Sequence, residues 1–330
     1  MINQWSGKNV LVTGAGGFLG STLTQQLIEA GANVRAFVRY NSRGDSGLLK
    51  LLPAQHLKNV EIIAGDLRDL PAVQNAVEQI EVVFHLGALI AIPYSYVHPV
   101  EVAETNIMGT INVMTACLQK DARMIHTSTS EVYGTALRVP IDEDHPLQGQ
   151  SPYSASKIGA DKMVESYYRS FGLKVVTVRP FNTYGPRQSA RAVIPTIITQ
   201  VINSDVIHLG NLDTRRDFTY VTDTTAGFIA AAQKEGLEGE TFNLGTGTEI
   251  SIAELVEKII RISGRKVEVV IDQQRLRPEK SEVMRLLSDN SKAKKMLGWE
   301  PMVNFDEGLA KTYAWVKEHM HLYQPGVYQF

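Results

Sequence analysis

The sequence predicts a doubly wound α/β fold, in which a parallel sheet lies between helices, with a smaller mixed α/β lobe in the C-terminal part. Two observations carry this prediction. Short apolar runs alternate with helical patterns from Lys8 to Arg179, as they do in strands joined by crossover helices. A glycine-rich turn also separates the first apolar run from the first helical pattern. We therefore expect residues 1–180 to form a nucleotide-binding domain and residues 181–330 a discontinuous second lobe, parts of which return to the first domain.

The glycine-rich turn follows the first expected strand, Asn9–Thr13, and leads into a helix expected over residues 21–30. Each of its glycines has a separate role in a dinucleotide-binding turn. Gly14 makes the tight turn, Gly17 lets the backbone approach a pyrophosphate, and Gly20 lets helix and strand pack closely. The pyrophosphate would lie on the helix N-terminus, where free N–H groups and the helix dipole favour an anion. This arrangement predicts a Rossmann-type domain that binds a nicotinamide dinucleotide.

The end of the second expected strand, residues 33–38, indicates which dinucleotide is bound. A site selective for NAD carries Asp or Glu there to bind the ribose 2′-hydroxyl. This chain has Val38 followed by Arg39, Ser42 and Arg43, and two guanidiniums with a hydroxyl suit a 2′-phosphate. The alternative is that both arginines are solvated loop charges, and NAD stays possible. We predict NADP.

Strands and helices continue to alternate, with strands expected over 60–67 and 82–88 and helices over 70–79 and 100–118. Asp66 ends the third strand, where it would meet an adenine edge or form an Asx turn. His85 is interpreted as a packed histidine at a strand end, and we predict no metal site because no second ligand accompanies it. The other residues that we expect to contact the cofactor are Phe18, Leu19, Leu67, Leu86, Ala88 and Asn106.

Hydroxyl and carboxyl side chains gather after the next expected strand, residues 124–127. Thr129, Ser130 and Glu131 stand where this strand should give way to a loop. A sequence of this kind is common in turns, so by itself it does not establish a catalytic site. Its place after a nucleotide-binding domain favours a catalytic role.

A helix should begin at Ser151, a good N-cap, with Pro152 at its first position. Tyr153 and Lys157 then lie on one face of that helix, four residues apart. A nearby ammonium and the positive end of a helix both favour the phenolate form of tyrosine. The pair would therefore make Tyr153 a base at neutral pH. The alternative is an exposed tyrosine and lysine without a catalytic role.

After Arg179 the strand–helix alternation breaks down, and the expected elements are shorter. We expect a loop over 180–187, a helix over 192–202, a short strand over 207–210 and a strand-like run over 215–221. A capping box at Ser251 starts a helix that runs to Ile262, and another helix begins within 289–292.

Length and composition bound the function. A chain of 330 residues with 44% hydrophobic residues is an ordinary globular protein, and its net charge of −2 gives no support to nucleic-acid binding or a membrane-surface role. Cys117 is the single cysteine, and no apolar run approaches the roughly 20 residues that span a bilayer. The first strand begins too early to leave room for a signal peptide. We expect a cytoplasmic protein.

The motifs together resemble those of the extended short-chain dehydrogenases/reductases that act on nucleotide sugars, over essentially the whole chain. They are Gly14-x-x-Gly17-x-x-Gly20, Thr129, Tyr153-x-x-x-Lys157, Arg179-Pro180-Phe181-Asn182, Arg216-Asp217 and Leu297-Gly298-Trp299. The closest resemblance is to the N-acetylglucosamine-nucleotide 4,6-dehydratases of the legionaminic acid pathway. It rests on the segments 91–96, 149–154 and 185–191, together with Thr129-Ser130-Glu131.

The resemblance implies a reaction and its residues. Tyr153 would take the proton of the sugar C4 hydroxyl, Thr129 would orient that oxygen, and Glu131 would remove the C5 proton. Ser130 or Glu131 would help water to leave from C6, and hydride would return to C6, so that a tightly bound cofactor is regenerated in each turnover. Substrate binding is assigned to Thr129, Asn182, Arg191, Arg216, Arg277 and Glu282.

Three alternatives stay open. A nucleotide-glucuronate decarboxylase would use the same Thr-Ser-Glu with a guanidinium on the sugar carboxylate, for which Arg187 or Arg191 is available. A 4-epimerase would have no use for Glu131. A catalytically silent NADP-binding regulator would have no need of Thr129, Tyr153 and Lys157.

The resemblance also implies a homodimer built through a four-helix bundle, and possibly a tetramer. The helices expected after Val100 and after Pro152 carry apolar residues on more than one side, which favours a self-complementary contact. The residues concerned are Met114, Met163, Val164, Tyr167 and Tyr168.

Overall fold

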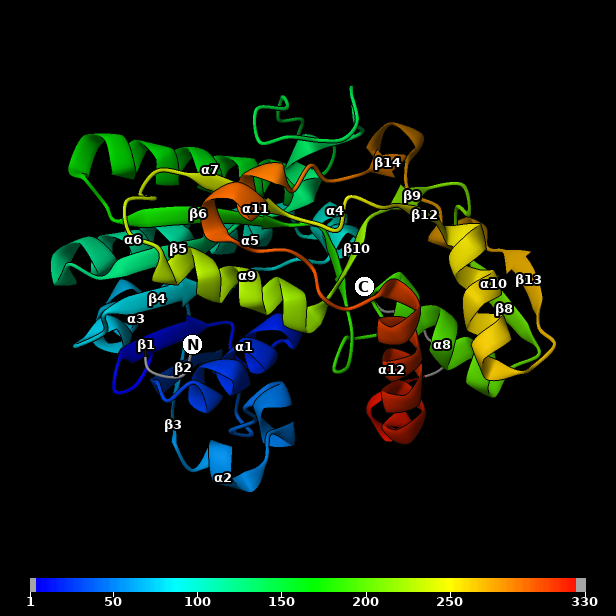
Figure 1. Cartoon of the computed structure of the whole chain (residues 1–330), viewed down its shortest axis with the longest axis horizontal. Helices are drawn as coiled ribbons and strands as arrows, with labels where there is room; N and C mark the ends of the chain where they lie inside the picture. Colours follow the sequence, from blue (N-terminus) through cyan, green and yellow to red (C-terminus); the bar gives the residue numbers. More distant parts are fainter. Residues whose placement is uncertain (1–3, 325–330) are drawn as a thin grey trace.

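The structure is a computed structural model that describes residues 4–324, and its centre is a seven-stranded parallel sheet (Figure 1). The strand order is β11-β6-β5-β4-β1-β2-β3. The strands are β1 (Asn9–Thr13), β2 (Asn33–Arg39), β3 (Val60–Gly65), β4 (Val82–His85), β5 (Arg123–Thr127), β6 (Val175–Pro180) and β11 (Thr241–Leu244). The predicted fold class is confirmed. The order reverses between β1 and β4, and ligands of open α/β sheets bind at such a point, beyond the carboxyl ends of the strands.

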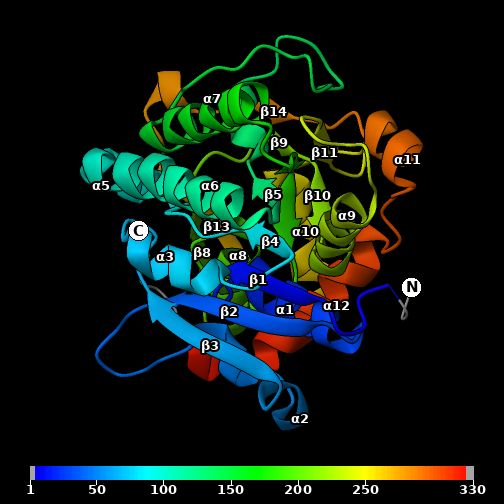
Figure 2. The same ribbon diagram turned by 90° about the vertical axis from the view of Figure 1, so that its left-hand side faces the viewer.

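Both faces of the sheet are buried under helices, as Figure 2 shows. In β1, Val10 and Val12 point to one core and Leu11 to the other, and all three are fully buried. One face packs on α1 (Phe18–Glu29) and α9 (Val221–Gln233). The other packs on α3 (Leu70–Val77), α6 (Gly109–Lys120) and α7 (Pro152–Phe171).

The helix expected over 100–118 is a continuous helical segment with a change of pitch. It consists of α5 (Pro99–Ala103), a π-helical turn (Glu104–Met108) and α6. Single π-turns inside helices are frequent at functional sites. This one contains Asn106.

The second lobe has a core of its own, to the right in Figure 1. Its helices are α8 (Val193–Asn203), α10 (Ile252–Ser263) and α12 (Phe305–Glu318), and its strands β8 (Val206–Leu209) and β13 (Glu268–Ile271) pair in parallel. The capping box at Ser251 forms with both of its hydrogen bonds, so the predicted start of α10 is confirmed. The remaining helices are α2 (Ala54–Leu57), α4 (Ile92–Val97) and α11 (Ser291–Leu297).

The strand-like run expected over 215–221 is wrong as a single strand. It divides into β9 (Arg215–Arg216) and β10 (Phe218–Tyr220), and Val221 already begins α9. The buried carboxylate of Asp217 causes the break, because it accepts hydrogen bonds from the backbone N–H groups of Thr246, Gly247 and Ser288.

β9 and β10 consequently join different sheets. β9 pairs with β12 (Ile250–Ser251) and β14 (Arg285–Leu286), whereas β10 pairs with β7 (Asn182–Tyr184). β7 lies within the segment expected to be a loop. These pairings bring Asn182 and Arg216 to the carboxyl edge of the central sheet.

Within residues 4–324, no helix is long and apolar enough to cross a membrane. In the same residues, no three side chains of the metal-ligating types come close enough together to hold a metal ion.

Candidate functional site

The glycine-rich turn after β1 has the geometry of a pyrophosphate cradle. Gly14 has φ of +68°, and a Cβ atom on Gly20 would lie 2.2 Å from the carbonyl oxygen of Gly14, so neither position accepts a side chain. Gly17 is the N-cap of α1, which no side chain caps. A Cβ atom on Gly17 would meet only the Gly14 carbonyl within 4 Å, so the backbone is open on that side. The turn therefore fits the pyrophosphate of a dinucleotide.

The loop after β2 packs against this turn, which the sequence did not indicate. The N–H of Leu48 donates to the carbonyl of Gly16 (2.9 Å), and the Asn41 side chain bonds to three backbone groups of the loop. Arg39 and Arg43, the predicted 2′-phosphate ligands, are exposed at the edge of this loop. Arg39 lies 3.4 Å from the carboxylate of Glu101 on α5. The guanidinium is thus near the ribose end of the site but already has an anionic neighbour.

Asp66 forms the Asx turn that was the alternative for it. Its Oδ1 accepts the backbone N–H of Arg68 at 2.9 Å, and the Arg68 guanidinium binds both carboxylate oxygens. These bonds lower the pKa of Asp66, which stays ionised at neutral pH. The contact of Asp66 and Leu67 with adenine stays a prediction.

Asn106 organises the loop after β4 with its side chain. Its Oδ1 accepts the N–H of Leu89, and its Nδ2 donates to the Leu89 carbonyl and to Ser156 Oγ, at 2.8 to 2.9 Å. The loop that contains Leu86 and Ala88 is thereby tied to α7. Both N–H groups of its amide have partners, and the contact of Asn106 with a cofactor stays a prediction.

His85 is a packed histidine at the end of β4, as predicted. Its Nδ1 lies 2.8 Å from Thr13 Oγ1 and its Nε2 lies 3.0 Å from Thr110 Oγ1. Burial holds the pKa of His85 well below its usual value, so the imidazole is neutral.

The helix that carries Tyr153 and Lys157 begins as predicted. Ser151 is the N-cap of α7, Ser154 completes a capping box with it, and Pro152 follows the cap. Tyr153 and Lys157 lie on the inner side of α7, and only 7% and 3% of their surfaces are exposed. The alternative of an exposed pair is therefore excluded.

Tyr153 and Lys157 have different hydrogen-bond partners in the free protein, and the effect of Lys157 on the phenol stays a prediction. Burial raises the pKa of Tyr153, while a hydrogen bond with the Thr129 side chain opposes that rise. Lys157 instead donates to the backbone carbonyl of Thr127 at 2.7 Å. Burial lowers the pKa of Lys157 to about 8, and the charge of Asp161 opposes that shift. The ammonium is thus bound to the end of β5.

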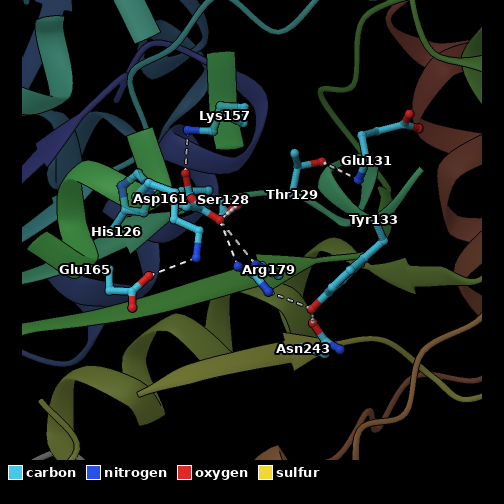
Figure 3. Close-up of polar contacts among 12 residues, drawn as sticks. His126, Ser128, Thr129, Glu131, Tyr133, Lys157, Asp161, Glu165, Arg179 and Asn243 are labelled. Carbon is cyan, nitrogen blue, oxygen red and sulfur yellow. Dashed lines mark hydrogen bonds and ion pairs between the residues drawn. The ribbon is translucent and has the colours of Figure 1, made fainter. Parts of the chain in front are cut away.

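Glu131 and Thr129 are joined in one short turn. Thr129 is the N-cap of the 3-10 turn Ser130–Tyr133, and its Oγ1 accepts the N–H of Glu131 at 3.2 Å. The carboxylate of Glu131 points away from the buried side chains around Asp161 (Figure 3). Its charge opposes the fall in the pKa of Arg216 that burial causes, so it lies near that arginine. Ser130 is buried in the same turn.

The predicted substrate residues Arg216, Arg277 and Glu282 form one cluster. Arg216 and Arg277 lie 3.7 and 3.6 Å from the same carboxylate oxygen of Glu282. Within the described residues, Arg277 Nη1 and the buried Asn182 Oδ1 have no hydrogen-bond partner. Two cations with unsatisfied polar atoms beside the Glu131 turn suit a diphosphate.

The other two arginines considered for the substrate lie apart from this cluster. Arg191 is exposed. Arg187 has φ of +73° and donates from Nη2 to Gln25 on α1 at 2.7 Å. Arg187 therefore joins the second lobe to the nucleotide-binding helix.

Sequence reasoning missed two parts of the site. The first is a strap over residues 273–284 that crosses from the second lobe, where Ser281 Oγ donates to the Gln150 carbonyl (2.5 Å) and contacts Tyr96 (2.6 Å). The second is Asp161, which is buried one turn after Lys157. The spacing from Tyr153 to Lys157 to Asp161 would have indicated it.

Comparisons with known proteins agree with this geometry. Residues 11–312 match the protein family described as GDP-mannose 4,6-dehydratase. A dTDP-D-glucose 4,6-dehydratase of Homo sapiens is 32% identical over 324 residues, covering 95% of this chain and 91% of the human protein. A double mutant of the dTDP-glucose 4,6-dehydratase of Streptomyces venezuelae, solved with NAD bound, has a TM-score of 0.86 at 28% identity, covering 95% of this chain and 98% of that one. The UDP-glucose 4-epimerase of Thermotoga maritima, solved with UDP-glucose, has a TM-score of 0.85 at 30% identity, covering 94% and 99%.

Proposed function

The chain belongs to the GDP-mannose 4,6-dehydratase family of extended short-chain dehydrogenases/reductases, and we propose that it dehydrates a nucleotide-linked N-acetylglucosamine to the 4-keto-6-deoxy sugar. It is an NAD(P)-dependent enzyme of the nucleotide-sugar 4,6-dehydratase and epimerase class. The observation that carries the choice of dehydration is Glu131, a carboxylate held in the same turn as Thr129, which contacts Tyr153.

The first half of the reaction is an oxidation at C4. Bound NAD(P) would accept hydride from C4 and return it to C6. Tyr153 takes the proton of the C4 hydroxyl, and Thr129, which already contacts the phenol, orients the same oxygen. Lys157 supplies a positive charge beside the phenol, which favours the phenolate.

The second half is an elimination. A ketone at C4 acidifies the proton on C5, and Glu131 is the base that removes it. Water then leaves from C6, with the proton supplied by Glu131 or by Ser130 in the same turn. Arg216, Arg277 and Asn182 bind the diphosphate, and Glu282 binds ribose hydroxyls.

The neighbourhood of Glu131 weighs against the two enzymatic alternatives. The reaction of a 4-epimerase has no step that needs a carboxylate at this position. A decarboxylase needs a guanidinium on the sugar carboxylate, but Arg187 is engaged with Gln25 on the nucleotide-binding helix. Arg191 is exposed and stays available for that role, so the decarboxylase is the second candidate.

Three finer assignments rest on the sequence motifs. The acetamido sugar, carried by UDP or GDP, rests on the likeness of segments 91–96, 149–154 and 185–191 to the legionaminic acid dehydratases. NADP rests on Arg39, Ser42 and Arg43, although the related structure from Streptomyces venezuelae holds NAD. The cytoplasmic location rests on Cys117, a buried free thiol.

A homodimer is part of the proposal, but only partly through the residues first expected. Met114 and Val164 lie in the core between the helices and the sheet, so they cannot form an interface. The exposed apolar residues of the same helical segments include Met108, Leu118, Tyr168 and Phe171, at 50%, 39%, 38% and 58% exposure. They favour a contact of this face with a second copy.

The experiment that tests the function compares three substrates. The purified protein is incubated with nucleotide-linked N-acetylglucosamine, glucose and glucuronate, and the products are identified by mass. We expect loss of water from the acetamido sugar without net consumption of cofactor. Loss of carbon dioxide from the glucuronate, with no water loss from the acetamido sugar, would establish the decarboxylase instead.

A further inference from the structure

Three charged or polar side chains follow one another along the inner side of α7. Tyr153, Lys157 and Asp161 are spaced by four residues, so they lie on successive turns of one helix face. They are 7%, 3% and 6% exposed. Tyr153 contacts the Thr129 side chain, and Lys157 donates to the carbonyl of Thr127. The first two turns of α7 are thus each in contact with the chain at or just after the end of β5.

The third turn contacts the end of β5 through Asp161, as Figure 3 shows. Its carboxylate accepts hydrogen bonds from Ser128 Oγ at 2.7 Å and from the Nη2 and Nε atoms of Arg179 at 3.0 and 3.3 Å. His126 Nε2 lies 3.0 Å from the other oxygen. Asp161 therefore binds the residues on both sides of Thr127, as well as β6 through Arg179. Within the described residues, it forms no hydrogen bond or ion pair with the turn of Glu131 or with the glycine-rich turn.

Asp161 is also the opposite charge that Lys157 faces. The titratable groups that interact with the charge of the ammonium are Asp161 on α7, His126 on β5 and His85 on β4. Burial lowers the pKa of both imidazoles, and the charge of Lys157 adds to that, so both are neutral. Burial would raise the pKa of Asp161, but the bond from His126 and the charges of Arg179 and Lys157 hold it at about 2. Asp161 is ionised throughout the working range of pH.

We propose that Asp161 is a positioning residue for this reaction. It fixes the end of β5, which leads to Thr129, in register with the helix that carries Tyr153, and it keeps Lys157 a cation. The inference rests on the proposed function, in which Tyr153 acts as the base and Lys157 as its cation. It assigns a task to a side chain that does not touch the substrate.

The test is the pH dependence of turnover in Asp161→Asn, a variant that keeps the shape of the side chain and removes its charge. We expect wild-type kcat to fall as the pH rises through the Lys157 pKa of about 8, because the ammonium is then lost. Removing the negative charge of Asp161 lowers the pKa of Lys157, so the decrease in kcat at alkaline pH (the alkaline fall) moves to lower pH by about one unit. We also expect kcat at pH 7 to fall at least tenfold, since misplaced catalytic groups cost up to about 100-fold, with KM within about twofold.

Two further variants separate charge from position. Ser128→Ala removes one hydrogen bond, and Asp161→Glu moves the carboxylate by one methylene, but both keep the negative charge. Each should lower kcat and leave the alkaline fall where it is in the wild type. The control is Glu165→Gln, one turn further along α7, where the carboxylate pairs with Lys162 and Arg169 near the surface. It should change neither quantity.

An unmoved alkaline fall in folded Asp161→Asn overturns the inference, whatever its kcat. If that variant does not fold, wild-type kcat in both Ser128→Ala and Asp161→Glu overturns it. The proposed function fails in a distinguishable way, because Tyr153→Phe would then retain dehydration. If Tyr153→Phe is inactive and Asp161→Asn has the wild-type pH profile, only the role of Asp161 is lost.

Discussion

The side chains of the proposed reaction come from the end of one strand and from the face of one helix. Thr129 and Glu131 come from the turn after β5, and Tyr153 and Lys157 come from the first two turns of α7. Burial raises the pKa of the Tyr153 phenol, so it is protonated in the free protein at neutral pH.

At the same scale, the charges after β2 predict the choice of cofactor. We expect cofactor-free protein to bind NADP more tightly than NAD, because Arg39 and Arg43 supply charge-assisted hydrogen bonds to a 2′-phosphate. Arg39→Ala combined with Arg43→Ala should weaken NADP binding about tenfold or more in titration calorimetry, and leave NAD binding unchanged. Arg261→Ala, an exposed arginine of the second lobe, is the control. Equal or tighter NAD binding in the wild type would show that the arginines are only loop charges.

Residue types could be predicted from the sequence, but not the partners of each side chain. Thr129, Tyr153 and Arg216 lie where the motifs indicated. Asn106 was expected on the cofactor, and in the structure its amide also binds Leu89 and Ser156. Lys157 was expected to act on Tyr153, and in the structure its ammonium also donates to a backbone carbonyl. The partners of a side chain depend on its contacts with residues that are distant in the sequence. These contacts decide which polar groups the fold leaves without a partner.

At the scale of elements, the start of α7 determines the position of Tyr153. The capping box of Ser151 and Ser154 satisfies backbone N–H groups of the first turn, and Pro152 fixes the first helical residue. Ser151→Ala should lower the free energy of unfolding by about 1 kcal/mol, measured by urea denaturation. Ser166→Ala, at an exposed position of the same helix, should cause no loss. Equal stability of the two variants would mean that the cap contributes nothing.

Elements with clear start signals could be predicted, and elements without them could not. The N-cap of α7, the capping box of α10 and the glycine-rich turn before α1 could all be predicted from the sequence. α9 was missed because it follows β10 directly, with Tyr220 as an N-cap that makes no side-chain bond. β11, which completes the sheet beside β6, was missed with it.

At the scale of the whole molecule, the second lobe completes the site. The strap over 273–284 carries Arg277 and Glu282 toward the first domain and is fixed there by Ser281 on Gln150. The substrate cluster thus depends on both lobes, which the composition of either half does not indicate.

Assembly is the prediction that belongs to this scale. We expect a dimer by light scattering at micromolar concentration, because α6 and α7 expose Leu118 and Phe171. Leu118→Glu combined with Phe171→Glu should produce a monomer, since charges are depleted from interface cores. Met302→Glu, at a side chain that is 79% exposed in the second lobe, should leave the dimer intact. A monomeric wild type would contradict the prediction.

The central claim, that Glu131 takes the C5 proton after oxidation at C4, is tested most directly by the absorbance of reduced nicotinamide in Glu131→Gln mixed with substrate. The amide cannot accept the C5 proton, and loss of a general base typically costs about 10²–10⁴-fold. Oxidation should therefore proceed while elimination stalls, so that reduced cofactor accumulates on the protein. Tyr153→Phe, mixed in the same way, should give neither product nor reduced cofactor. Near-normal dehydration by Glu131→Gln, with no accumulation of reduced cofactor, would contradict the account.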